Sequence, residues 1–161
     1  MTLTRSKVEW APYATGFQGA VAHLPGALLL AEKVYSPQLR NHRSIVVYLP
    51  RRYHDEPLRR FPVIYMQDGQ NLFDPATSYG GVPWLAADAA ESLADSGREP
   101  IIVGIYHGGR RRIREYNPFA DWRRGRGTAY ARFVAETVKP LIDAAFRTLP
   151  DREHPAIVGS S

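Results

Sequence analysis

The chain has 161 residues, of which 44% are hydrophobic, and it carries a formal net charge of +5. This length and apolar content suffice for the core of one domain, which excludes a chain that is disordered throughout. The sequence contains no cysteine, which excludes disulfide bonds and thiolate chemistry. Because no apolar run is long enough for a signal-peptide core or a membrane span, we expect a soluble, cytoplasmic protein without a membrane partner.

The first predicted elements are strands. Residues 1–26 are interrupted by glycine and proline and predict no element. The runs ALLLAEKVYSPQL, from residue 27, and RSIVVYLP, from residue 43, are joined by a polar turn and predict an antiparallel pair. A polar connector follows. The continuous apolar run FPVIYMQ, residues 61–67, then predicts a buried strand.

The middle of the chain predicts a long loop, a helix and another strand. The loop, residues 68–83, has glycine or proline near both ends, and loops of this length inside domains are usually functional. The segment WLAADAAESLADSG predicts a helix that stops at Gly97, with Leu85, Ala89 and Leu93 on one side. PIIVGIY, residues 100–106, predicts a second strand that is buried on both faces.

The last part predicts an amphipathic helix and a third strand of the buried type. Apolar residues recur at spacings of three and four over residues 127–148, and Pro140 should bend or divide this helix. PAIVGS, from residue 155, predicts the strand. The alternation of helices and apolar strands predicts an α/β fold with a mostly parallel sheet and helices on both faces. Its chemistry should collect in the loops after Gln67, Tyr106 and Val158, at the carboxyl ends of the strands.

The chain ends in AIVGSS, in which a strand-like run leads into Gly159-x-Ser161. This is the first half of Gly-x-Ser-x-Gly, the tight turn that raises a catalytic serine out of the backbone. Taken alone, Gly-Ser-Ser is also typical of a flexible tail. Its place after a third buried-type strand favours the nucleophile turn, with Ser161 as the catalytic residue.

The stretch Asp68-Gly69-Gln70-Asn71 is a second candidate. Acyl transfer passes through an oxyanion that backbone N–H groups stabilise, and one donor often comes from the loop after the third strand. Gly69 would let the chain turn closely enough for the N–H groups of Gln70 or Asn71 to point into a site. An isolated Asp-Gly pair is otherwise an ordinary turn. We interpret His107-Gly108-Gly109 as a loop, because it follows the wrong strand for an oxyanion sequence.

Several motifs in a fixed order now carry a family resemblance. FPVIYMQDGQNLFD, Trp84, PIIVGIYHGG with RRIREYNPF, VKPLIDAAFRTLPDRE and AIVGSS together resemble the esterase family of α/β-hydrolases, over about residues 28–161. Relatives include enterochelin-esterase-like, feruloyl and acetyl-xylan esterases and S-formylglutathione hydrolase. The resemblance implies a serine carboxylic-ester hydrolase that forms an acyl-enzyme and needs no metal or organic cofactor. It also implies a small-molecule or carbohydrate-linked ester as substrate.

The same resemblance implies roles for particular residues. Ser161 is similar to the family's nucleophile, and Gly69, Gln70 and Asn71 to its oxyanion-hole loop. The stretch Arg114-Glu115-Tyr116-Asn117-Pro118 is similar to one that lies near the site in the family. The residues for which we expect substrate contact are Trp84, Arg114, Glu115 and Tyr116.

Family members continue after the serine with the segments that carry the triad acid and histidine. The triad order is serine, acid, histidine, and all five histidines of this chain precede Ser161. We therefore expect residues 1–161 to form a single incomplete α/β-hydrolase domain that is catalytically incompetent alone. The strand at residues 156–158 would be an apolar edge, which predicts self-association with other chains.

An arginine-rich segment leaves a different class of function open. Seven arginines lie between Arg110 and Arg126, interleaved with Tyr116, Phe119 and Trp122. This mixture could bind nucleic acid through phosphate contacts and stacking. The alternative, which we prefer, is a solvated loop whose arginines pair with Glu115 and Asp121 or receive an anionic substrate. A non-catalytic remnant that serves as an interaction module is a third interpretation.

Overall fold

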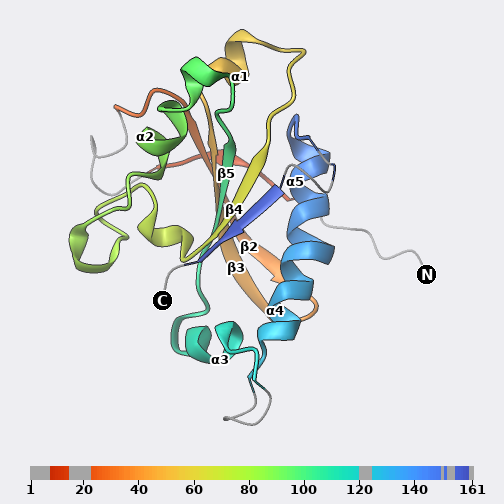
Figure 1. Cartoon of the computed structure of the whole chain (residues 1–161). Helices are drawn as coiled ribbons and strands as arrows, with labels where there is room; N and C mark the ends of the chain where they lie inside the picture. Colours follow the sequence, from red (N-terminus) through yellow and green to blue (C-terminus); the bar gives the residue numbers. More distant parts are fainter. Residues whose placement is uncertain (1–7, 15–22, 120–124, 150, 152–154, 160–161) are drawn as a thin grey trace.

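The computed structural model describes residues 8–14, 23–119, 125–149, 151 and 155–159 (Figure 1). Its centre is a six-stranded sheet in the order β1-β2-β3-β5-β4-β6. The strands are β1 (Ala11–Pro12), β2 (Ala27–Ser36), β3 (Asn41–Leu49), β4 (Val63–Gln67), β5 (Ile101–Ile105) and β6 (Pro155–Val158). The first three strands and the β3–β5 contact are antiparallel, whereas β4 runs parallel to β5 and β6. The predicted strands and the α/β fold are confirmed, but the described sheet is mixed rather than mostly parallel, and β1 lies in a segment for which no element was predicted.

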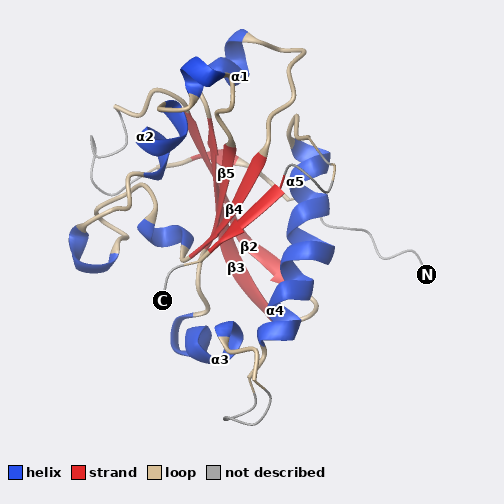
Figure 2. Cartoon of the chain, viewed as in Figure 1, coloured by secondary structure: helices blue, strands red, loops and turns tan. Residues whose placement is uncertain are grey.

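Helices cover both faces of the sheet (Figure 2). On one face lie α4 (Gly127–Phe133), a π-helical segment (Val134–Val138) and α5 (Lys139–Ala145). The other face carries α2 (Ala86–Glu91), and two short helices, α1 (Arg52–Asp55) and α3 (Arg112–Tyr116), lie at opposite ends of the sheet (Figure 1). No helix within the described ranges is long and apolar enough to cross a membrane.

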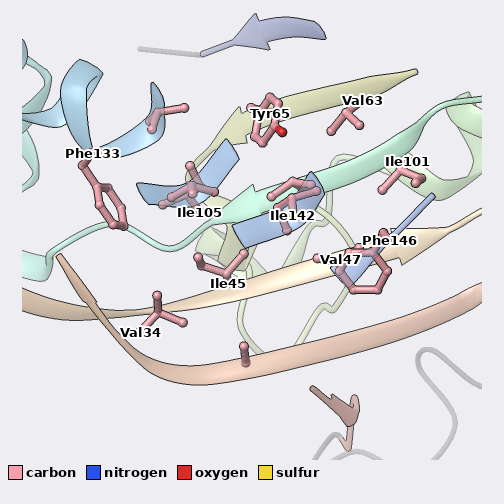
Figure 3. Packing of buried hydrophobic residues seen from close by; sticks show 14 of the residues in the cluster. Val34, Ile45, Val47, Val63, Tyr65, Ile101, Ile105, Phe133, Ile142 and Phe146 are labelled. Atoms are coloured by element: carbon pink, nitrogen blue, oxygen red, sulfur yellow. The ribbon is translucent and has the colours of Figure 1, made fainter. Parts of the chain in front are cut away.

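The larger core lies between the sheet and the α4–α5 segment. Phe133, Ile142 and Phe146 from the helical layer pack over Ile45 and Ile105 of the central strands (Figure 3). Burying side chains of this size contributes about 1.5–3 kcal/mol each. Strand β5 is buried along its whole length, as its uninterrupted apolar pattern predicts. This core fixes the strands whose ends carry the candidate site.

The buried side of α2 differs from the side that the sequence pattern suggests. Leu85 and Leu93 are 60% and 41% exposed. The buried side chains of α2 are Ala86, Ala87 and Ala90, which pack in one cluster with residues of β3 and β5, and Ala94 is buried in the turn that follows. Small side chains allow the helix to lie close to the sheet. Close packing therefore determines which side is buried, although the other side has the larger hydrophobic residues.

Pro140 divides the long helix, as expected. The π-helical segment ends at Val138, and Pro140 occupies the first turn of α5. A proline lacks the N–H that an α-helix would use there and its ring crowds the preceding turn. The wider π turn accommodates both defects, because it shifts the hydrogen-bond pattern by one residue.

Strand β6 is the outer strand of the sheet among the described residues. It pairs only with β4 there, and its apolar residues Ile157 and Val158 are 66% and 42% exposed. The sequence pattern of a buried strand thus occurs at an exposed edge. This edge position confirms the expectation for residues 156–158; self-association remains a prediction.

Candidate active site

Three loops meet at the carboxyl ends of the parallel strands. Gln67 pairs with Ile105, and Met66 pairs with Val158, so β4, β5 and β6 end side by side. The N–H of His107, after β5, donates to Oε1 of Gln70, after β4, at 3.3 Å. A Cβ at Gly159, after β6, would lie 2.5 Å from Oε1 of Gln67. The predicted convergence of these loops is confirmed.

The turn Gly69–Asn71 lies directly against β5. It is a 3₁₀ turn that begins after Asp68, whose backbone is left-handed at φ 54°. A Cβ at Gly69 would lie 2.4 Å from the carbonyl carbon of Gly104, and this approach requires glycine. The first bond within the turn runs from the N–H of Asn71 to the carbonyl of Asp68, at 2.8 Å. The amides of Gly69 and Gln70 precede that bond and therefore have no partner inside the turn.

Asn71 corrects one expectation about the oxyanion donors. Its N–H bonds to Asp68, so it does not offer a donor to a ligand. Its Oδ1 accepts from the N–H of Tyr79 at 2.9 Å, and its carbonyl accepts from the N–H of Trp84 at 2.8 Å. Asn71 therefore fastens the long loop to the turn. The side chain of Trp84, placed by this contact, is 39% exposed.

Asp68 and Arg112 form a two-pronged ion pair that sequence reasoning missed. The carboxylate of Asp68 is 2% exposed. Arg112 donates from Nε to Oδ1 at 2.8 Å and from Nη2 to Oδ2 at 2.6 Å. The hydroxyl of Tyr116 lies 3.4 Å from Oδ1, and the Arg112 guanidinium lies 5.1 Å from the Tyr116 ring. Burial, followed by the charge of Asp68, raises the pKa of Tyr116 to about 12, so its hydroxyl keeps its proton.

Glu115, for which we expected substrate contact, is buried and bonded to side chains of the sheet. It is 1% exposed, and its Oε2 lies 2.5 Å from Nη2 of Arg43. Its Oε1 accepts from Nδ2 of Asn41 at 3.0 Å. A Cβ at Gly108 would come within 2.6 Å of this carboxylate. Glu115 thus ties α3 to β3, and both of its carboxylate oxygens have partners within the protein.

The arginine-rich segment divides into bonded and exposed side chains. Arg126 donates from Nη1 and Nη2 to the carbonyls of Leu39 and Gln38, both at 3.0 Å. Arg112 pairs with Asp68, whereas the expected pairing of Glu115 is instead made by Arg43.

Arg110, Arg111 and Arg114 are exposed. Arg123, Arg124, Asp121 and Trp122 lie outside the described residues.

Ser161 also lies outside the described residues, which end at Gly159 after β6. Within the described ranges, no group of three or more His, Asp or Glu side chains is arranged to hold a metal ion. A signal for Arg112 and Asp68 did exist in the sequence: Asp68 follows one buried strand, and Arg112 closely follows the neighbouring one. Parallel strands bring such positions together.

A mixed sheet with helices on both faces, and a glycine turn at the carboxyl ends of its parallel strands, define an α/β fold. The chain belongs to the family described as "Putative esterase", whose model matches residues 36–161. This membership confirms the resemblance drawn from the sequence motifs.

Solved structures agree with this family. A ferulic acid esterase is 26% identical, with a TM-score of 0.57, over 83% of this chain and 48% of that protein. An IroE-like serine hydrolase from Shewanella oneidensis is 24% identical, with a TM-score of 0.56, over 74% of this chain and 39% of that protein. The enterobactin and salmochelin hydrolase IroE is 16% identical, with a TM-score of 0.60, over 84% of this chain and 52% of that protein. The chain thus spans about half the length of these proteins or less. A search of the curated proteins gave no match.

Proposed function

We propose that this chain carries the nucleophile side of a serine carboxylic-ester hydrolase. The nucleophile is Ser161, which in the sequence comes shortly after Val158, the last residue of β6. The oxyanion donors of the chain are the N–H groups of Gly69 and Gln70. The observation that carries the proposal is this turn, whose first two amides have no partner within it and which follows β4, the strand whose end pairs with the end of β6.

The reaction follows from these positions. The hydroxyl oxygen of Ser161 attacks the ester carbonyl, and a general base takes its proton. The negative charge that develops on the carbonyl oxygen is stabilised by the amides of Gly69 and Gln70. Collapse expels the alcohol and leaves an acyl-enzyme, which water then hydrolyses. No step requires a metal or organic cofactor.

Labelling with a fluorophosphonate probe tests the nucleophile directly. The probe reacts with activated serines, and peptide mass spectrometry locates the adduct. We expect the product of the full reading frame to be labelled at Ser161, and the Ser161→Ala variant to lose the label. Ser160→Ala is the matched control and should keep it. An adduct on Ser160, or none on either serine in a form that hydrolyses esters, would overturn the assignment.

The base and the acid of the triad are proposed to come from outside residues 1–161. Among the described histidines, His107 lies at the site edge, but its Nδ1 accepts from the N–H of Gly109 at 2.9 Å. We expect residues 1–161 alone to give no Ser161-dependent turnover of 4-nitrophenyl acetate. Turnover that disappears in His107→Ala would contradict this, because the base would then lie within the chain.

The substrate is proposed to be a small-molecule or carbohydrate-linked ester. Trp84 and Phe119 are exposed on loops and Arg114 on α3, and these side chains could contact aromatic, sugar or anionic parts of such an ester. Trp84→Ala is expected to raise KM for methyl ferulate more than for methyl acetate. An equal change for both esters would argue against contact between Trp84 and an aromatic group.

A further inference from the structure

The conformation of Asp68 sets the direction of the two amides that follow it. Asp68 has φ 54° and ψ 47°, a left-handed conformation that costs a non-glycine residue about 1–2 kcal/mol. Its carboxylate is also buried, and an unpaired buried charge is strongly unfavourable. Both costs must be offset by contacts that Asp68 makes only in this arrangement. The structure offers the guanidinium of Arg112 for that purpose.

The contact with Arg112 has the geometry of the strongest side-chain pairs. Two nitrogens of Arg112 meet two oxygens of Asp68, at 2.8 and 2.6 Å. Such a pair fixes orientation as well as distance, because both groups are planar. The carboxylate cannot rotate without breaking one of the two bonds. The backbone of Asp68, and the direction of the next two N–H groups, are therefore coupled to Arg112.

The segment that carries Arg112 is itself anchored to the sheet. Arg112 and Glu115 both belong to the five-residue helix α3. Glu115 is held by Arg43 on β3 at 2.5 Å, and Tyr116 stacks edge-on against Tyr130 of α4, with ring centroids 5.0 Å apart. α3 thus has fixed contacts on two sides. Its arginine reaches the turn after β4 from a rigid support.

We infer that Arg112 is a positioning residue, which aims the oxyanion donors of Gly69 and Gln70 through Asp68 and does not bind the substrate. This inference rests on the proposed function of the turn. It gives a role to the arginine-rich segment that differs from nucleic-acid or substrate binding. These two donors stabilise the charge that develops in the transition state. Because Arg112 orients them, loss of Arg112 should lower kcat.

Hydrogen exchange tests the positioning without any need for activity. In Arg112→Lys the charge remains but the two-pronged geometry is lost. We expect exchange of Asn71 and Leu72, whose amides are bonded within the turn, to become at least tenfold faster, with little change in β5. The matched control is Arg132→Lys, because Arg132 makes a similar two-pronged pair with Glu136, at 2.8 and 3.1 Å, on an exposed helix surface. Unchanged exchange of Asn71 and Leu72 in folded Arg112→Lys would overturn the inference.

Kinetics of the full reading frame supply the second readout. For Arg112→Lys we expect kcat to fall about tenfold or more and KM to stay unchanged, equally for neutral 4-nitrophenyl acetate and anionic mono-4-nitrophenyl succinate. A rise in KM confined to the anionic ester would show that Arg112 binds substrate, and would overturn the inference. If the unmodified protein hydrolyses no ester, the proposed function fails, while the exchange experiment still decides the role of Arg112.

Asp68→Asn provides a second test in case Arg112→Lys fails to fold. Asparagine keeps the size of the side chain and tolerates a left-handed backbone, but it loses the charge that Arg112 pairs with. We expect the same faster exchange and the same loss of kcat. The double variant Asp68→Asn with Arg112→Lys should add little to either single change, because the two residues act as one unit. Fully additive losses would show that they act independently, against the inference.

Discussion

Arg43 and Glu115 form an ion pair with both side chains buried, 0% and 1% exposed, and with 2.5 Å between Nη2 and Oε2. One residue lies on β3 and the other on α3. Nδ2 of Asn41 donates to the same carboxylate, and the carbonyl of Tyr106 accepts from Nη1 of Arg43. The pair thus fastens the segment after β5 to the sheet, and it governs where Arg112 lies.

Breaking this pair should destabilise the fold strongly. Glu115→Ala leaves the charge of Arg43 buried without its partner, which typically costs about 3–5 kcal/mol. Urea unfolding followed by circular dichroism measures this loss. The double variant Arg43→Met with Glu115→Leu removes both charges, and we expect it to be more stable than Glu115→Ala. A double variant less stable than the single one would contradict this account of the buried charge.

Gly69→Ala should disturb the turn through contact with the neighbouring strand. The added Cβ would lie 2.4 Å from backbone atoms of Gly104, so either the turn or β5 must shift. We expect a loss of unfolding free energy of about 1–3 kcal/mol, as for other overpacked sites, and a lower kcat. Gly80→Ala is the control, because Gly80 has φ 66° but open space around it. Gly69 itself has no positive φ, so a loss at Gly69 no larger than the loss from backbone strain at Gly80 would argue against the close contact with Gly104.

Titration of Tyr116 should reduce stability at alkaline pH. Its pKa is raised from 10.0 to about 12, mainly by burial. Above pH 10 the unfolded chain releases this proton while the folded chain still holds it, so stability falls between pH 10 and about 12. A pKa difference of this size between the folded and unfolded chains corresponds to about 3 kcal/mol at most. Urea unfolding of Tyr116→Phe should show a shallower loss over this range than the unmodified chain, whose other buried tyrosines also contribute. An unchanged slope would argue against the raised pKa.

The sequence predicts the strands well because their signals are local, whereas a contact between distant segments also depends on which strands are neighbours and how they are aligned. The uninterrupted apolar run of β5 is enough to predict that this strand is buried. The pairing of Asp68 with Arg112 joins positions 44 residues apart, and only the parallel register of β4 and β5 brings them together. Likewise, composition suggests that the arginines pair with Glu115, but its partner is Arg43 from an earlier strand. The buried side of α2 also depends on the space above the sheet, which favours alanines over leucines.

Self-association through β6 is the remaining prediction from the sequence. Ile157 and Val158 are exposed at the outer strand of the described sheet. An apolar edge with unpaired backbone groups tends to pair with strands of other chains. We expect residues 1–161 to sediment as concentration-dependent oligomers in analytical ultracentrifugation. Ile157→Lys should shift the population towards monomer, because edge lysines oppose strand pairing. Leu58→Lys is the control, since Leu58 is 97% exposed but lies in a loop outside the strands. A monomer at all concentrations, or an equal response to both lysines, would argue against association through this edge.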